Sequence, residues 1–237
     1  MANELFKNFP KIGYRLESGK YVTIRDFFRK STVEQSFIND IIDYEYYELQ
    51  DGERPDIVAT KIYGNGDLHW TLFLVNEFLN YNDWHKDTET FDIYMKEKYP
   101  GHYLTVTNVS DLIDQDKKFL LGEKISTPVG HGRVLQLQPT YKRLGVTNST
   151  KWRTGDVITG EVSGKSFEIE NVIEMKDGVS HYVNSDGLKK NYFENGYTSV
   201  SLIEHEMEHN EEKRKIKIIR PELINRVVNE FERLMSN

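Results

Sequence analysis

The 237-residue sequence predicts an α+β fold, and three stretches of the chain carry that prediction. Residues 42–100 contain a strand pattern, a helical pattern, a Gly-Asn-Gly turn and a second helical pattern. Residues 101–200 hold short β-prone runs between Gly, Asp, Asn and Ser turns, which is typical of a small antiparallel β domain. Residues 201–237 end in an amphipathic helical stripe. The chain therefore combines a strand–helix–helix unit with a separate β region.

The strand of the first unit lies in "YEYYELQDGERP" and ends in a turn at Asp51-Gly52. Pro55 follows in the first turn of a helix, where proline is tolerated, and Asp56 suits the positive end of the helix dipole. Gly64-Asn65-Gly66 ends this helix, and the second helix ends near Asn76. The apolar positions are Ile57, Val58, Ile62 and Tyr63 in the first helix and Leu68, Leu72, Phe73 and Val75 in the second. This unit still needs a second strand to pair with the first.

Residues 1–41 are predicted to form an N-terminal arm. Tyr21–Ile24 indicates a short strand, and Asp26 is placed to cap one or two helical turns after it. The apolar residues of the arm are scattered, so we expect it to pack on another surface.

The β region contains a faint internal repeat, because residues 119–137 align with residues 152–169 when one residue is skipped. Each copy has an aromatic residue, a Gly-acid pair, a β-branched residue, a later glycine and a β-prone tail. Two hairpin-like units of this kind suggest a small barrel or sandwich. A phosphate-binding loop is rejected because no Gly-Lys-[Ser/Thr] opens a helix here.

The last segment, 201–237, begins with a charged helix and continues into a short strand at Ile216–Ile219, which Pro221 closes. The terminal helix has its apolar positions at Leu223, Ile224, Val227, Val228, Phe231, Leu234 and Met235. This stripe can dock either on the body of the chain or in the groove of a neighbouring protein.

The charged helix contains His205-Glu206-x-x-His209, which is the pattern of a zinc hydrolase. A zinc-protease helix has to be largely buried, yet Met207 is the sole apolar residue between Glu204 and Lys213. Glu230, a possible third ligand by spacing, is separated from the pair by a strand and a proline. We therefore expect a solvent-exposed helix with no metal, no cofactor and no catalytic residue.

The composition limits the kinds of molecule that the chain is expected to bind. The formal net charge is −7, from 31 basic and 38 acidic side chains, so the chain lacks a general attraction to nucleic acid or anionic lipid. The run Lys213-Arg214-Lys215 is interpreted as a solvated flank. With no cysteine, no signal-peptide-like core in "MANELFKNFPKIGYR" and no membrane-length apolar run, we expect a soluble protein that is made and kept on the cytoplasmic side, unless it travels inside a larger particle.

The stretch "ERPDIVATKIYGNGDLHWTLFLVNEFLNYNDW" resembles the LysM-like segment of a small baseplate wedge protein of contractile-tailed bacteriophages. The residues that carry the resemblance are Arg54, Pro55, Asp56, Ala59, Ile62, Tyr63, Gly64, Leu68, Trp70, Asn76 and Trp84. "NFPKIGYR" and "IRDFFRK" are similar to the arm of that family, and "NEEKRKIKIIRPELINRVV" to its closing strand and helix.

The resemblance implies a LysM-like strand–helix–helix–strand core at 42–100, closed by residues 214–219, with residues 101–200 as an inserted β domain. It also implies a structural virion protein of the tail baseplate, assembled in the host cytoplasm and present in several copies around a six-fold tail axis. Such a protein would bind other wedge and inner-tail proteins. The alternatives are a peptidoglycan-binding LysM module and, far behind, a zinc hydrolase.

The candidate interface residues are the aromatic residues around the LysM-like unit and apolar positions of the last helix. They are Tyr46, Tyr47, Tyr63, Trp70, Tyr81, Trp84, Leu223, Val227 and Phe231. Interface energy often concentrates in single aromatic residues, although ordinary core packing is an equally good explanation for Tyr63 and Trp70.

Overall fold

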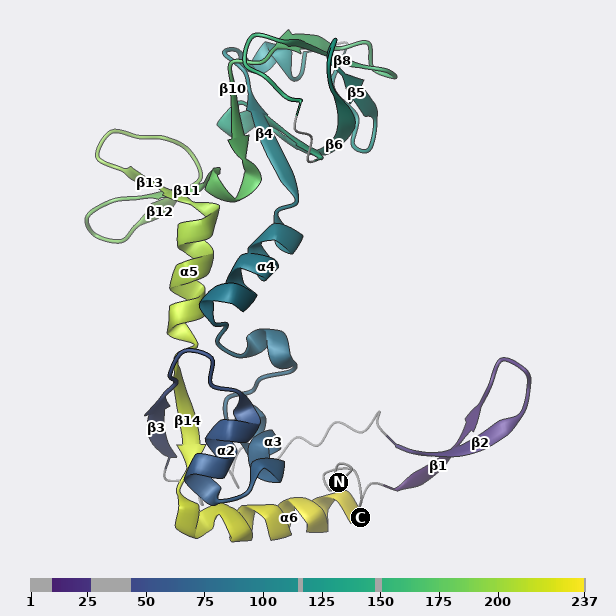
Figure 1. The fold of residues 1–237 in the computed structure, drawn as a ribbon, viewed down its shortest axis with the longest axis vertical. Coiled ribbons are helices and arrows are strands. Elements are labelled where there is room, and N and C mark those ends of the chain that lie inside the picture. Colours follow the sequence, from purple (N-terminus) through teal and green to yellow (C-terminus); the bar gives the residue numbers. More distant parts are fainter. Residues whose placement is uncertain (1–9, 27–43, 115–116, 148–150, 237) are drawn as a thin grey trace. The chain divides into compact units, whose positions relative to one another are not determined.

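A computed structural model describes residues 10–26, 44–114, 117–147 and 151–236 of the chain (Figure 1). Its contacts divide the chain into two units, one formed by residues 1–87 and 211–237 and the other by residues 88–210. Helices and strands are both abundant, as the α+β prediction requires. Within the described residues, no helix has the length and apolar character that a membrane crossing requires.

In the described part of the first unit, the strands form two separate two-stranded antiparallel sheets, β1–β2 and β3–β14. Its strands are β1 (Lys11–Arg15), β2 (Tyr21–Arg25), β3 (Tyr44–Glu48) and β14 (Lys215–Ile219). Its helices are α2 (Pro55–Tyr63), α3 (His69–Val75) and α6 (Ile224–Ser236), with short 3₁₀ turns η2 (Gly66–Leu68), η3 (Tyr81–Asp83) and η7 (Pro221–Leu223). The strand predicted at Tyr21–Ile24 is thus present, while the helical turns predicted after Asp26 fall outside the described residues.

Local sequence signals set the limits of α2 and α3. Pro55 occupies the first turn of α2, and Gly64 ends that helix in the left-handed conformation (φ 71°), which a residue with a Cβ adopts at a cost. The Asn65 side chain accepts a hydrogen bond from the N–H of Asp67 (3.0 Å) and so opens η2, and Asn76 ends α3. The two predicted helices are therefore confirmed, with their boundaries.

The core of the first unit lies between the β3–β14 sheet and the helices α2 and α3. It is built from Leu49, Val58, Ala59, Leu72, Trp84, Ile216 and Ile218. A second cluster joins Val75 and Ile219 to Ile224 and Val227 of α6. Each fully buried Val, Leu or Ile side chain contributes roughly 1.5–3 kcal/mol to folding, so strand β14 is held mainly by burial of its three isoleucines.

The described part of the second unit contains a large antiparallel sheet, a smaller sheet and two α-helices. The seven-stranded sheet has the order β10-β4-β7-β6-β5-β8-β9, and the smaller one the order β12-β11-β13. The strands are β4 (Gly101–Thr105), β5 (Lys124–Ser126), β6 (His131–Gln138), β7 (Arg143–Thr147), β8 (Val157–Gly160), β9 (Ser166–Glu168), β10 (Asn171–Glu174), β11 (Val179–Val183), β12 (Lys189–Lys190) and β13 (Thr198–Ser201). The helices are α4 (Thr88–Lys98) and α5 (Leu202–Glu212), and the sheet wraps around one core (Figure 1).

The internal repeat is a structural repeat. Its first copy forms the hairpin β5–β6 and its second the hairpin β8–β9, and β5 pairs with β8. In each copy the glycine of the Gly-acid pair has a positive φ and lies just before the first strand of the hairpin, at the hairpin's open end. The N–H of Gly122 (φ 79°) donates to the carbonyl oxygen of Val134 at 2.8 Å, and that of Gly155 (φ 85°) to the carbonyl oxygen of Ile169 at 2.8 Å. The two predicted hairpin units are therefore confirmed.

Candidate partner-binding surface

Trp84 lies in the core of the first unit. Its side chain is 5% exposed, stacks on Phe73 with ring centroids 5.8 Å apart, and donates from Nε1 to the carbonyl oxygen of Glu53 at 2.8 Å. The Glu53 carboxylate in turn accepts hydrogen bonds from the Tyr47 hydroxyl, the N–H of Gln50 and the Lys61 ammonium. These contacts fix the loop between β3 and α2. Trp84 and Tyr47 therefore stabilise this unit from within.

Two of the predicted interface residues present their rings to solvent. Tyr46 on β3 is 63% exposed, and Tyr81 in η3 is 67% exposed. The Lys215 ammonium lies 4.6 Å from the centroid of the Tyr46 ring, and Phe73 packs edge-on against Tyr81 at 5.2 Å. Both rings are therefore supported on one side and open on the other, the arrangement that an anchoring aromatic residue needs.

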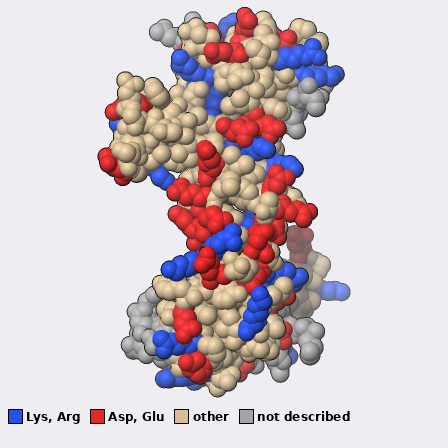
Figure 2. Space-filling view, turned by 60° about the vertical axis from the view of Figure 1, so that its left-hand side comes forward, with Lys and Arg blue, Asp and Glu red and all other residues tan. Residues whose placement is uncertain are grey.

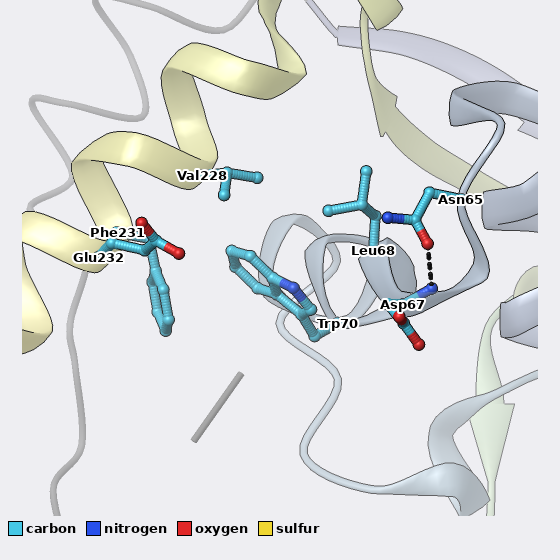
Figure 3. Close-up of a pocket in the computed structure, with 7 residues that line it drawn as sticks. All are labelled: Asn65, Asp67, Leu68, Trp70, Val228, Phe231 and Glu232. Atoms are coloured by element: carbon cyan, nitrogen blue, oxygen red, sulfur yellow. Dashed lines mark hydrogen bonds between the residues drawn. The ribbon is translucent and has the colours of Figure 1, made fainter. Parts of the chain in front are cut away.

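The terminal helix α6 packs its apolar face against η2 and α3 (Figure 3). Val227 and Phe231 are buried, Leu223 is half-buried, and the rings of Phe231 and Trp70 lie 4.5 Å apart. A pocket of about 60 Å³ lies where α6 meets η2 and α3. Its lining residues are Asn65, Asp67, Leu68, Trp70, Val228, Phe231 and Glu232. Pockets for small ligands enclose roughly 300 Å³ or more, so this pocket is too small to hold a ligand of that kind.

The outer edge of β14 is closed by two side chains from the helices. The amide of Asn76 both accepts from the N–H and donates to the carbonyl oxygen of Lys217, each at 2.8 Å. The Tyr63 hydroxyl does the same for Ile219, at 3.0 and 3.1 Å. Tyr63 thus holds β14 in place through its hydroxyl. On the edge of β14 that faces away from β3, the backbone groups of Lys217 and Ile219 therefore have hydrogen-bond partners.

The His205-Glu206-x-x-His209 pattern lies on α5, where the glutamate and the histidines point in different directions. His205 contacts His181 of β11 and His209, with ring centroids 5.1 and 4.4 Å away. The Glu206 carboxylate instead accepts hydrogen bonds from Tyr94, Lys98 and Tyr99. Among the described residues, no group of three or more His, Cys, Asp or Glu side chains is arranged to hold a metal ion.

The contacts of Glu206 explain how α4 and α5 lie side by side (Figure 1), and they were not predicted from the sequence. Acidic side chains also gather at the height of these helices in Figure 2, and Glu206 differs from them because its side chain is 12% exposed. Burial pushes the pKa of its carboxyl up, but its three hydrogen bonds outweigh burial and hold that pKa below the ordinary value of 4.5. The ionised form is therefore the one that stabilises the folded unit.

Glu206→Gln is expected to lower the free energy of unfolding at pH 7 by about 1.5–3 kcal/mol, the cost of losing charge-assisted hydrogen bonds. Because the folded-state pKa is depressed, the contribution of Glu206 is present above pH 4.5 and is lost as the pH falls through the folded-state value. Urea unfolding between pH 3 and pH 7 measures this, with Glu208→Gln as the exposed control on the same helix. Equal losses for both variants at pH 7 would contradict this role.

Sequence reasoning missed a group of exposed apolar side chains on the second unit. Leu188, Tyr192 and Phe193 are 61%, 53% and 66% exposed, and all three lie between β11 and β13. A local signal for it exists, since a Gly-Leu and a Tyr-Phe pair stand among turn residues in "DGLKKNYFENG".

Comparison with protein families bears on the first unit and the start of the second. Residues 5–108, which include β1, β2, β3, α2, α3, α4 and β4, match the family model described as base plate wedge protein 53. No curated protein sequence matches the chain. Over residues 5–108, the match confirms the resemblance to a baseplate wedge protein drawn from the sequence.

Proposed function

We propose that this chain holds baseplate wedge subunits to one another through protein–protein contacts and performs no chemical step. The observation that carries the proposal is the family match over residues 5–108, because the matched segment also holds the exposed rings of Tyr46 and Tyr81. Its partners would be other wedge and inner-tail proteins of a contractile tail, and its copies would stand around a six-fold axis.

The core of the first unit supports a LysM-like interpretation. Strand β3, helices α2 and α3 and strand β14 follow one another in the order strand–helix–helix–strand, and β14 pairs antiparallel with β3. The chain between α3 and β14 would then be an insertion, which surface loops of a small domain tolerate when the ends of the insertion lie close together. The contacts between α4 and α5 supply that closeness.

A phage that carries a nonsense codon in the gene for this chain tests the proposal. In a host that does not suppress the codon, we expect tails without complete baseplates, and plasmid-borne wild-type chain should restore them. The double variant Tyr46→Ala, Tyr81→Ala should be incorporated less than wild type, because both anchoring rings are gone, whereas Val162→Ala on the second unit should match wild type. Normal baseplates in the absence of the chain would refute the proposal.

A peptidoglycan-binding module is the second candidate, because LysM folds bind cell-wall sugars elsewhere and exposed tyrosine rings can stack on sugars. Co-sedimentation with bacterial sacculi separates the two functions. The informative variants are Tyr46→Ala and Tyr81→Ala, since Trp84 is buried and its loss would act through the fold. Saturable binding that either variant abolishes would favour the sugar-binding function.

A further inference from the structure

The β3–β14 sheet has two different edges. Asn76 and Tyr63 occupy the outward backbone groups of Lys217 and Ile219 on β14. In an antiparallel pair, residues whose backbone groups point outward lie opposite one another, and Lys217 and Ile219 are paired with Tyr46 and Tyr44. The N–H and C=O groups of Tyr44 and Tyr46 therefore point away from β14, along the outer edge of β3.

This outer edge lacks most of the features that protect natural edge strands. β3 has the sequence Tyr-Glu-Tyr-Tyr-Glu, with no proline, and it pairs with β14 in continuous register without a bulge. Among the described strands, β3 pairs with β14 and with no other, and the Tyr46 side chain beside this edge is 63% exposed. An edge of this kind is suited to the addition of a strand.

The hairpin β1–β2 has a complementary edge. The N–H of Leu16 donates to Lys20 and that of Asp26 to Pro10, so the alternation along β2 directs the backbone groups of Tyr21 and Thr23 outward. Strand β2 is also the better of the two for pairing, because β1 has a glycine in its middle. A two-stranded hairpin is marginally stable in water, and two further strands would give it a larger sheet.

We propose that the β1–β2 hairpin of one copy of this chain adds to the outer edge of β3 of a second copy, with Thr23 opposite Tyr46. This contact rests on the proposed binding function and names one way in which copies join. In this antiparallel register the five residues of β2 match the five of β3. Val22 then lies opposite the half-buried Tyr47, and Thr23 lies opposite the solvent-facing Tyr46. Ile24 lies opposite Glu45, on the same face of β3 as Tyr47.

Charge supports the same pairing. Residues 11–25 contain four basic side chains and one acidic side chain, whereas β3 contains two glutamates and no basic residue. In the proposed register Glu45 lies opposite Ile24 and Arg25 opposite Tyr44, so no basic side chain directly faces a glutamate. The opposite net charges of the two segments instead favour their encounter, whereas two copies of β3 would repel each other. Among the described strands of one chain, β1–β2 and β3–β14 are separate sheets, so we assign the added hairpin to another copy.

A disulfide trap tests this contact directly, because the chain has no cysteine of its own. Full-length Thr23→Cys and full-length Tyr46→Cys are mixed and oxidised mildly. Directly opposite residues with outward-pointing groups stand about 5.5 Å apart at Cα, which suits a disulfide. We expect roughly ten-fold more mixed disulfide than from Thr23→Cys mixed with Val162→Cys, since pairing raises the effective concentration of the two thiols.

Tyr46→Pro provides the second test. It removes the outward N–H without touching the hydrogen bonds to β14, so the thermal melt should stay close to that of wild type while concentration-dependent association in ultracentrifugation is lost. Tyr46→Thr, which keeps the N–H, should still associate. Mixed disulfide no greater than the control, together with association unchanged in Tyr46→Pro, would overturn the proposal. That result would leave incorporation into baseplates, and thus the proposed function, untouched.

Discussion

Trp84→Ala is expected to lower the free energy of unfolding of the first unit by about 3–5 kcal/mol, the usual cost of removing a buried tryptophan. The side chain stacks on Phe73, meets Phe78 edge-on and fixes the carbonyl oxygen of Glu53 through Nε1. The substitution leaves a cavity and also leaves that carbonyl oxygen without its donor. Urea unfolding of the full chain, followed by far-ultraviolet circular dichroism, measures the loss.

Trp84→Phe is the matched control, because it keeps a ring against Phe73 but cannot donate the hydrogen bond. It should lose part of the stability, about 1–3 kcal/mol. A Trp84→Ala variant as stable as wild type would mean that this tryptophan is available to a partner, contrary to its burial.

Arg143→Ala is expected to destabilise the second unit by about 3 kcal/mol or more, because a buried cation holds several elements together there. Arg143 is 3% exposed and its guanidinium lies 3.7 Å from the centroid of the Tyr103 ring and 4.6 Å from that of Tyr141. It donates to Gln138 Oε1 at 2.6 Å and to the carbonyl oxygen of Val179 at 2.7 Å. Truncation leaves both acceptors unpaired beside a cavity.

Arg143→Lys should recover little of this loss, since an ammonium cannot reach both acceptors and lie flat on the rings at once. Arg153→Ala, at an exposed position of the same unit, serves as the control and should stay within about 0.5 kcal/mol of wild type. The melting temperatures of the three variants, measured by thermal melts, rank their stabilities. Equal melting temperatures for Arg143→Ala and Arg153→Ala would contradict a structural role for the buried guanidinium.

The sequence predicts those parts of the fold that local signals determine. Pro55 and Gly64 mark the limits of α2, and the two Gly-acid pairs mark the two hairpins of the β region. Helix α4 was not predicted, because it is largely charged and buries just Met95 among its eleven residues. Its position depends on hydrogen bonds to Glu206, more than a hundred residues away in the sequence.

The sequence indicated which residues could form the candidate surface. It did not indicate which of their side chains are exposed or which strand edge is open. Tyr46 and Trp84 are both aromatic residues beside polar ones, and sequence alone does not tell that the first is exposed and the second buried. The open edge of β3 depends on its register with β14 and on the side chains of Asn76 and Tyr63. These contacts join segments about 140 to 175 residues apart, so no local pattern contains them.

The central claim is that this chain is a binding component of the baseplate wedge, and a density map of the intact tail tests it most directly. The proposal predicts that the chain lies in the baseplate, with the rings of Tyr46 and Tyr81 covered by neighbouring protein. A baseplate without this chain, or a chain in which both rings face solvent, would contradict it.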